Sequence, residues 1–293
     1  RCVEHIQDNC LRDTFVNIGH YIGCDDKTIR TIANNYIECL NKAYKPNLEG
    51  WISIDETTID GKLRFVVTNV EDRAFIDMFE SRDKAVVSNW LQRNRNAPIE
   101  GFVMDMWKPY KDAIRAVFPN TPIVVDKFHV VKEVNKAMDE LRRLERKGND
   151  LLKGHKYTFL KSKLTPEIKS EKDFLMELYP KLGQGYQLLE MFKDFWDIKQ
   201  KAEAETYLAF WCDYADDSGI YPFQKASKTI KAHWSGIINY IESRINNGVI
   251  EGINSKIQLA KKRARGYRNT TNFINMIYFT CSKLKFNYPL YST

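Results

Sequence analysis

Residues 51–59 read WISIDETTI and residues 99–105 read IEGFVMD, and these two stretches decide the fold. Each is a short, largely apolar run with the length and the β-branched or aromatic content of a buried strand. Asp55 closes the apolar part of the first run, and Asp105 closes the second. We therefore expect both carboxylates at the ends of buried strands, where the backbone holds them rigidly.

Around these stretches, residues 51–126 contain strand-like and helix-like segments in the order expected of an α/β domain. Asp60-Gly61 is a two-residue turn signal between two strand-like runs, which predicts a hairpin. The expected strands are 51–59, 63–70, 74–79, 99–104 and 122–125, and the expected helices are 84–95, 109–117 and one after Asp126. This order is that of a ribonuclease-H-like core, a mixed sheet with helices.

The segment from 127 to about 245 is helical in pattern and rich in Leu, Lys, Glu and aromatic residues. We interpret it as an all-α insertion that precedes the last core helix. That helix has an apolar stripe at Ile250, Ile253, Ile257, Ala260 and Ala264. Glu251 lies beside the stripe, on the side that carries Asn247, Asn254, Ser255 and Gln258, so it can reach a site at the sheet edge while the stripe packs.

The N-terminal pattern predicts a small helix-turn-helix within residues 12–38. Gly19 is small where two helices would cross, Gly23 permits a turn, and Asp25 or Asp26 can cap the second helix. In the functional interpretation that helix enters a DNA groove. Its DNA-contacting residues would be Lys27, Thr28 and Arg30. The alternative is a helical hairpin that only docks on the rest of the protein.

These patterns predict four segments. They are a helix-turn-helix at 1–45, the first part of the catalytic core at 46–130, the helical insertion at 131–240, and the Glu251 helix with a basic C-terminal segment at 241–293.

The charge distribution favours an anionic partner. The 293-residue chain has a formal net charge of +7, and residues 256–268 carry six Lys or Arg and no acid. These side chains can hold DNA phosphates, and Tyr267 can stack on an exposed base. The expected contacts are Lys256, Lys261, Lys262, Arg263, Arg265, Tyr267 and Arg268. A solvated helix face is the alternative interpretation of the same run.

Two other classes of protein are disfavoured. The six cysteines show no CxxC spacing, which argues against a zinc site, and they are too sparse for a disulfide-stapled fold. We therefore expect reduced thiols and a cytoplasmic protein. We also expect no secretory signal, and the sequence has no apolar run near the roughly 18 residues that a membrane span needs.

Three acids distant in sequence can form one metal site. Asp55 and Asp105 are expected on adjacent strands, and Glu251 on a helix packed against the sheet. Two divalent ions about 4 Å apart can stabilise both the attacking and the leaving oxygen of a phosphodiester, and carboxylates are the ligands that Mg²⁺ prefers. Each acid alone is more simply a turn, cap or surface residue. The competing acids are Glu56, Asp60, Asp112, Asp126 and Glu242.

Asp126 and His129 form a second constellation, since His129 follows about one helical turn after Asp126. His129 can donate to a phosphate or orient a metal-bound carboxylate. Alternatively, Asp126 caps a helix that begins near Lys127, and His129 is a packed helix residue. The residues alone leave both readings open.

Five motifs in order along residues 12–280 resemble the ISL3 family of bacterial insertion-sequence transposases, which have a DDE catalytic core. They are SIDE at 53–56, VMDMWKPY at 103–110, VVDKFHV at 124–130, HWSGI at 233–237 and NGVIEGINSK at 247–256, followed by the basic run with Gly266-Tyr267. The resemblance implies a retroviral-integrase-like fold, a helical insertion before Glu251, and Asp55, Asp105 and Glu251 as the metal-binding triad.

The Asp126 and His129 pair resembles a motif of related eukaryotic DDE transposases, where it supports the active site. Such families also carry a zinc-binding segment ahead of the helix-turn-helix. None occurs in this sequence, so we expect either a truncated chain or a degraded copy.

The combined expectation is a DNA transposase that uses two Mg²⁺ (or Mn²⁺) ions to cleave strands at the element's ends and join them to target DNA. Its partners would be double-stranded DNA, both terminal inverted repeats and target, and further copies of itself in a homodimer or higher assembly. We expect it in the bacterial cytoplasm, associated with the nucleoid. The alternatives are a nuclease of the same fold that only hydrolyses and a non-catalytic DNA-binding protein derived from such an enzyme.

Overall fold

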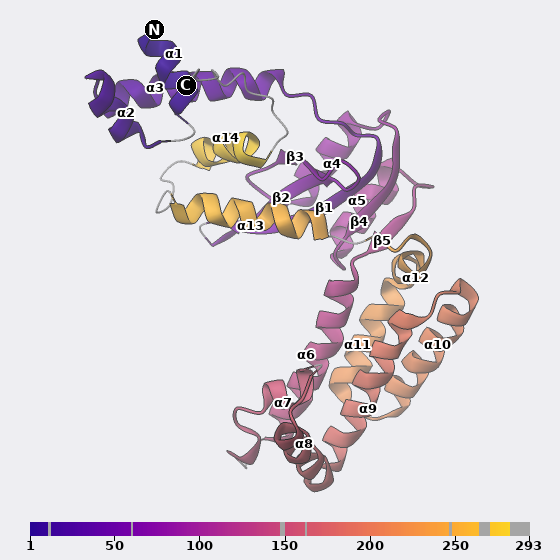
Figure 1. Cartoon of the computed structure of the whole chain (residues 1–293). Helices are drawn as coiled ribbons and strands as arrows, with labels where there is room; N and C mark the ends of the chain where they lie inside the picture. Colours follow the sequence, from indigo (N-terminus) through magenta and orange to yellow (C-terminus); the bar gives the residue numbers. More distant parts are fainter. Residues whose placement is uncertain are drawn as a thin grey trace. The chain divides into compact units, whose positions relative to one another are not determined.

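The computed structural model describes residues 1–10, 13–59, 61–146, 150–161, 163–245, 248–263 and 270–281 (Figure 1). Internal contacts divide the chain into two compact units: unit 1 comprises residues 1–100, 113–119 and 247–293, and unit 2 comprises residues 101–112 and 120–246. The predicted mixed α/β class is confirmed. Within the described residues, five strands form one mixed sheet in the order β3-β2-β1-β4-β5.

Three helices open unit 1: α1 (Cys2–Asn9), α2 (Phe15–Ile22) and α3 (Asp26–Ala43). Each contributes apolar side chains to one small core. α1 and α2, with 8 residues each, are too short to be stable without such packing. The buried members of this core are Ile6, Cys10, Ile18, Ile29 and Ala33.

The turn between α2 and α3 has the chemistry that the sequence predicts. Gly23 adopts a φ of +72°, which costs glycine little. A Cβ on Gly19 would lie 2.6 Å from the Cys24 carbonyl oxygen, so only glycine fits there. Asp25 accepts a 2.9 Å hydrogen bond from the Thr28 N–H and so caps α3.

Unit 1 continues with β1 (Gly50–Ile59), β2 (Lys62–Asn69) and β3 (Ala74–Met78). β1 and β2 pair antiparallel, and Ile59 faces Lys62 across the turn. Gly61 has a φ of +75°, the left-handed conformation that a two-residue hairpin requires. Asp60, the other predicted turn residue, lies outside the described residues.

The next elements in the chain are α4 (Lys84–Arg93), β4 (Ile99–Met104), α5 (Lys108–Val117), β5 (Ile123–Val125) and α6 (Lys127–Glu145). Each lies close to its predicted range. β4 and β5 pair in parallel, with Met104 opposite Val125. Residues 102–104 of β4 and 123–125 of β5 are unbroken apolar runs because their side chains are buried on both faces of the sheet.

Two helices complete unit 1, α13 (Gly248–Arg263) and α14 (Thr270–Cys281), and they share a core with β1, β2 and β3 (Figure 1). The predicted stripe of α13 is confirmed for Ile250, Ile253 and Ile257, which are buried, and Ala260 packs against them. Ala264 lies outside the described residues. The face of α13 beside the stripe therefore lies at the edge of its contact with the strands.

Helices make up the rest of unit 2: α7 (Lys156–Leu160), α8 (Pro166–Leu178), α9 (Pro180–Asp194), α10 (Lys201–Asp217), α11 (Tyr221–Ala232) and α12 (Trp234–Ser243), with 3₁₀ turns at Asp150–Leu152 and Phe195–Asp197. Trp211 is fully buried among them, and its indole N–H donates to the Leu188 carbonyl at 2.8 Å. Among the described helices, none is both long and apolar enough to cross a lipid bilayer.

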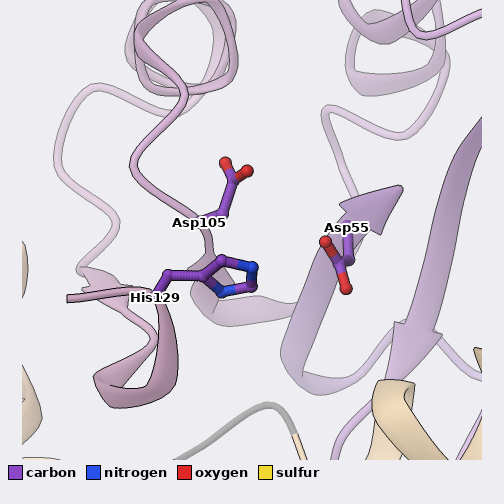
Figure 2. A group of neighbouring side chains, drawn as sticks. All are labelled: Asp55, Asp105 and His129. Atoms are coloured by element: carbon purple, nitrogen blue, oxygen red, sulfur yellow. The ribbon is translucent and has the colours of Figure 1, made fainter. Parts of the chain in front are cut away.

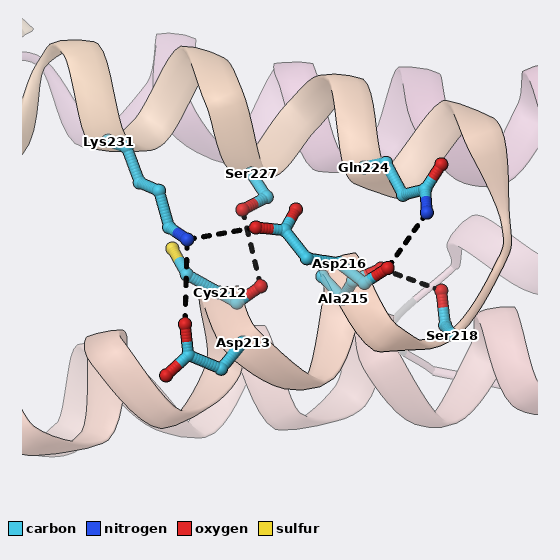
Figure 3. A network of polar contacts seen from close by, with 8 residues as sticks. All are labelled: Cys212, Asp213, Ala215, Asp216, Ser218, Gln224, Ser227 and Lys231. Carbon is cyan, nitrogen blue, oxygen red and sulfur yellow. Dashed lines mark hydrogen bonds and ion pairs between the residues drawn. The ribbon is translucent and has the colours of Figure 1, made fainter.

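A polar network joins α10 to α11 (Figure 3). The Lys231 ammonium group lies 2.8 Å from Asp216 and 3.5 Å from Asp213. Beneath it, the buried Ser227 hydroxyl donates to the Cys212 carbonyl at 3.3 Å. These contacts fix α11 along its length, up to the corner where α12 begins.

α12 packs closely on β5. A Cβ on Gly236 would lie 2.6 Å from Val125 Cγ2 and 3.3 Å from the Val125 backbone nitrogen. The Asn239 side-chain amide donates to the Ile123 carbonyl at 2.9 Å. Glycine at this position is therefore a requirement of packing.

We predict that Gly236→Ala destabilises the protein by about 1–3 kcal/mol, because the added methyl group overpacks the α12–β5 contact. Gly252→Ala is the matched control. Nothing lies within 4 Å of a Cβ at Gly252 in α13, so alanine should stabilise the helix there by roughly 0.5–1 kcal/mol. Denaturant unfolding of both variants measures the difference, and equal effects would contradict the packing argument.

Candidate functional site

The parallel register of β4 and β5 determines where two aspartates lie. Met104 and Val125 end the strands opposite each other, and the Asp126 N–H donates to the Met104 carbonyl at 2.9 Å. Asp105 and Asp126 are the next residues, so both leave the sheet at the same edge. The turn after β4 is closed by the Trp107 N–H, which donates to Asp105 Oδ1 at 2.8 Å.

Asp55 lies in the middle of β1 and pairs with Val66. The expectation that Asp55 ends a strand is wrong. The β-branched residues Thr57 and Thr58 favour extended backbone, and the hairpin carries the strand on to Ile59. The Asp55 side chain is held on a central strand of the sheet and is only 8% exposed.

The structure brings together Asp55, Asp105 and His129. Each offers one ligand atom, and these atoms all lie within 4.8 Å of one another (Figure 2). Two carboxylates at such a separation repel each other unless a cation or a proton lies between them. The group therefore has the composition and spacing of a divalent cation site.

Asp126 and His129 are in direct contact. Asp126 occupies the N-cap position of α6, but its side chain makes no cap hydrogen bond. Instead its buried Oδ2 atom lies 3.2 Å from His129 Nδ1. A carboxylate on one ring nitrogen fixes the orientation of the imidazole and leaves the other nitrogen for a ligand. This geometry favours the functional reading of the pair over simple capping.

α13 reaches Asp55 through an amide. The Asn254 Nδ2 atom donates to Asp55 Oδ2 at 3.3 Å, and Gln258 Nε2 donates to Thr57 Oγ1 at 3.2 Å and to the Thr58 carbonyl at 2.9 Å. The four-residue step from Asn254 to Gln258 rises about 6 Å along the helix, and the two-residue step from Asp55 to Thr57 rises about 6.6 Å along the strand. Because the two rises match, the contacts hold α13 in a fixed alignment along β1. Asn254 and Gln258 lie on the helix side predicted for Glu251, but sequence reasoning gave neither a role at the site.

Glu251 lies in the first turn of α13, and its side chain is exposed. It is not a member of the group formed by Asp55, Asp105 and His129. It precedes Asn254 by three residues, which places the two on the same face of the helix. Glu251 is therefore about one helical turn from the amide that contacts Asp55.

Of the competing acids, Asp126 contacts His129 at 3.2 Å, while three others lie in other surroundings. Glu56 pairs with Arg82 at 2.5 Å, and Glu242 pairs with Lys201 at 2.9 Å. Asp112 is exposed on α5. Asp60 is outside the described residues. These settings leave Asp55 and Asp105 as the acids of the cation site.

The predicted DNA contacts are described in part. Lys27, Thr28 and Arg30 are exposed in the first turns of α3, where Arg30 pairs with Asp26 at 3.0 Å. On α13, Lys256 and Lys262 are exposed and Lys261 is half-buried. The backbone of Arg263 ends α13. Outside the described residues lie Arg265, Tyr267 and Arg268.

The residues present fit Mg²⁺ or Mn²⁺. Carboxylate oxygens are the ligands that both ions prefer, and an imidazole nitrogen is a common ligand of transition metals. The Asn254 Oδ1 atom is buried and has no hydrogen-bond partner among the described residues, so it adds an unsatisfied oxygen beside Asp55. The donor set contains no thiolate, which disfavours a structural zinc site.

Comparison with known proteins identifies the class. A family model described as a transposase, that of the ISL3 group of DDE enzymes, matches residues 52–277. This match covers most of the chain and includes every member of the cation group. The protein belongs to the ISL3 transposase family.

Two relatives agree with this assignment. The transposase for insertion sequence element IS1001 of Bordetella parapertussis is 28% identical over 185 residues, which are 60% of this chain and 46% of the relative. The transposase for insertion sequence element IS1557 of Mycobacterium tuberculosis is 24% identical over 266 residues, which are 78% of this chain and 59% of the relative. The chain thus spans about half the length of these relatives.

We predict that Mn²⁺ raises the thermal stability of the wild-type protein and that Asp105→Asn removes this shift. Binding to the folded state alone contributes about 2.7 kcal/mol at a hundredfold excess over Kd. Without metal the variant should be at least as stable as the wild type, because the substitution relieves carboxylate repulsion. Asp112→Asn, which changes an exposed acid outside the group, should keep the full shift; an equal shift in Asp105→Asn would count against the site.

Proposed function

We propose that this protein is a DNA transposase with a ribonuclease-H-like catalytic core. In this proposal the helices of unit 2 interrupt the core. The chain would be divided as the sequence predicts, into a helix-turn-helix at 1–45, the first part of the core at 46–130, the helical insertion at 131–240 and the Glu251 helix with the basic segment at 241–293. The observation that carries the proposal is the proximity of Asp55, Asp105 and His129. Membership of the ISL3 family supports the proposal independently, because the matched region contains all three residues.

The chain's own residues would bind and orient the reacting groups. Asp55 and Asp105 would hold the cations, rigidly placed by the sheet, and Glu251 would complete the ligand set from α13. When bound, two divalent ions supply charge stabilisation to the attacking and leaving oxygens of a phosphodiester. The same site would serve strand cleavage at the element's end and the joining of the freed 3′ end to target DNA.

Asp126 and His129 would support this site. Asp126 holds one ring nitrogen of His129 at 3.2 Å, so the imidazole has a fixed direction. Because His129 lies beside the two carboxylates, it would either bind the cation or donate a hydrogen bond to a phosphate of the DNA. Asn254 would help to position Asp55 through its 3.3 Å hydrogen bond.

DNA would be held by two sets of basic residues. One is the exposed start of α3, with Lys27, Thr28 and Arg30, as the second helix of a helix-turn-helix that contacts the terminal repeats. The other is the basic run that begins on α13 with Lys256. Lysine and arginine contacts to phosphate are strong at low salt and independent of sequence. We further propose a homodimer or larger assembly that acts on the bacterial nucleoid.

A nuclease that only hydrolyses is the nearest alternative. Incubation with a pre-cleaved element end separates the two, because only a transposase joins that end to a target. A non-catalytic DNA-binding protein is the second alternative, and metal-dependent cleavage of DNA by the purified protein would exclude it.

Asp105→Asn should lower metal-dependent strand cleavage by at least about 100-fold, because it removes a ligand charge from the cation site. The fold and the affinity for DNA should be unchanged. Cleavage assays on a supercoiled plasmid, with binding measured in parallel, test this, and Asp112→Asn should cleave normally. Retained cleavage in Asp105→Asn would remove this residue from the mechanism.

Lys256→Ala should weaken DNA binding about equally for all sequences and reduce the slope of log affinity against log salt by about 1. The reason is the loss of a single phosphate contact. Filter binding or fluorescence anisotropy at several salt concentrations measures the slope. Lys228→Ala, an exposed lysine on α11, is the control, and an unchanged slope in Lys256→Ala would exclude this contact.

A further inference from the structure

Phe128, in the first turn of α6, is an exposed aromatic residue beside the cation group. The residue is 56% exposed. Single exposed apolar residues are common on proteins, so exposure alone says little about function. What distinguishes Phe128 is its position. Among the large exposed apolar residues of the described chain, it is the one next in sequence to a member of the cation group, His129.

The rings of Phe128 and His129 are also in contact. Their centroids lie 5.5 Å apart, and the ring planes are nearly perpendicular, at 83°. Such an edge-to-face contact uses at most one of the two faces of the phenyl ring. His129 is itself held by Asp126 at 3.2 Å. The phenyl ring therefore lies next to the cation group and still presents a face to solvent.

A cation shares this exposed side of the helix. Lys132 follows Phe128 by four residues, so the two side chains lie on one side of α6, and both are exposed. Lys136, one turn further along, lies 3.7 Å from Glu133, so its charge is partly balanced. An aromatic ring with a lysine one turn away is the composition of surfaces that bind single-stranded nucleic acid, in which the ring stacks on a base and the cation contacts the backbone.

We infer that this face of α6, formed by Phe128 and Lys132, binds a single-stranded part of the DNA, with an unpaired base stacked on the phenyl ring. Inside a duplex both faces of a base are covered by its neighbours, so a base must leave the stack before it can pack on a protein ring. Lys132 contacts a phosphate of the same strand. The inference rests on the proposed function, because it places the stacked nucleotide close to the phosphate that the cation site would cut.

Fluorescence anisotropy on the 293-residue chain tests this with two labelled probes. One is a blunt DNA duplex, and the other is the same duplex with a single-stranded tail of about eight nucleotides. EDTA is present, so neither probe is cut. Phe128→Ala should weaken binding of the tailed probe about 5- to 100-fold, because the stacking of a base is lost, and should leave binding of the blunt probe unchanged.

Two further substitutions at the same position identify stacking as the cause. Phe128→Tyr keeps an aromatic ring and should bind the tailed probe as the wild type does. Phe128→Leu keeps an apolar side chain without a π-face and should bind it as weakly as Phe128→Ala. A tail of abasic nucleotides has phosphates but no bases, so the wild type and Phe128→Ala should bind that probe equally.

Phe174→Ala is the matched control, since Phe174 on α8 is an aromatic residue of similar exposure, at 59%, and its loss should affect neither probe. Lys132→Ala should reduce the slope of log affinity against log salt for the tailed probe by about 0.7, the value for one phosphate contact on a single strand.

Equal binding of the tailed probe by Phe128→Ala and the wild type, or full binding by Phe128→Leu, would overturn the inference. So would a changed oligomeric state in Phe128→Ala without weaker binding of the tail, because the ring would then belong to an interface between copies. These outcomes leave the proposed function untouched, since that depends on metal-dependent cleavage. A wild-type protein that binds the tail through Phe128 but never cuts DNA would refute the proposed function instead, and the single-strand site would stand.

Discussion

The parallel pairing of β4 with β5 is the constraint on which the candidate site depends. It ends both strands in register, so Asp105 and Asp126 emerge together at one edge of the sheet. α6 begins at once, and one helical turn later His129 returns to contact Asp126 at 3.2 Å. A shift of one residue in this register would turn one of the two acids to the opposite face, because successive side chains of a strand alternate in direction.

A second constraint acts on Asp55. β1 fixes its backbone, and the polar edge of α13 follows the strand through Asn254 and Gln258. The apolar stripe of the same helix is buried against β2 and β3, with Ile250 and Ile257 fully enclosed. Burial thus supplies the stability of this contact, while the amides determine its alignment. Glu251, in the first turn of the same helix, is exposed and lies three residues before Asn254.

The sequence predicts those features that depend on local pattern. Alternating and continuous apolar runs gave the strands, and the stripe of α13 gave its buried face. The predicted range 51–59 matches β1, but the place of Asp55 was misjudged because the apolar part of the run ends there while the strand continues to Ile59. The hydrogen bond from Asn254 to Asp55 joins residues far apart in sequence, and no spacing rule encodes it. The grouping of His129 with both acids likewise depends on the strand order, which a single sequence only suggests.

The central claim is that Asp55, Asp105 and His129 bind divalent cations. Crystals of the protein grown with Mn²⁺ test it most directly, through an anomalous difference map recorded on the long-wavelength side and the short-wavelength side of the manganese absorption edge. The account predicts a manganese peak within bonding distance of the Asp55 and Asp105 carboxylates. Carboxylates that diverge in the crystal with no manganese between them, under conditions in which Mn²⁺ supports cleavage, would contradict it.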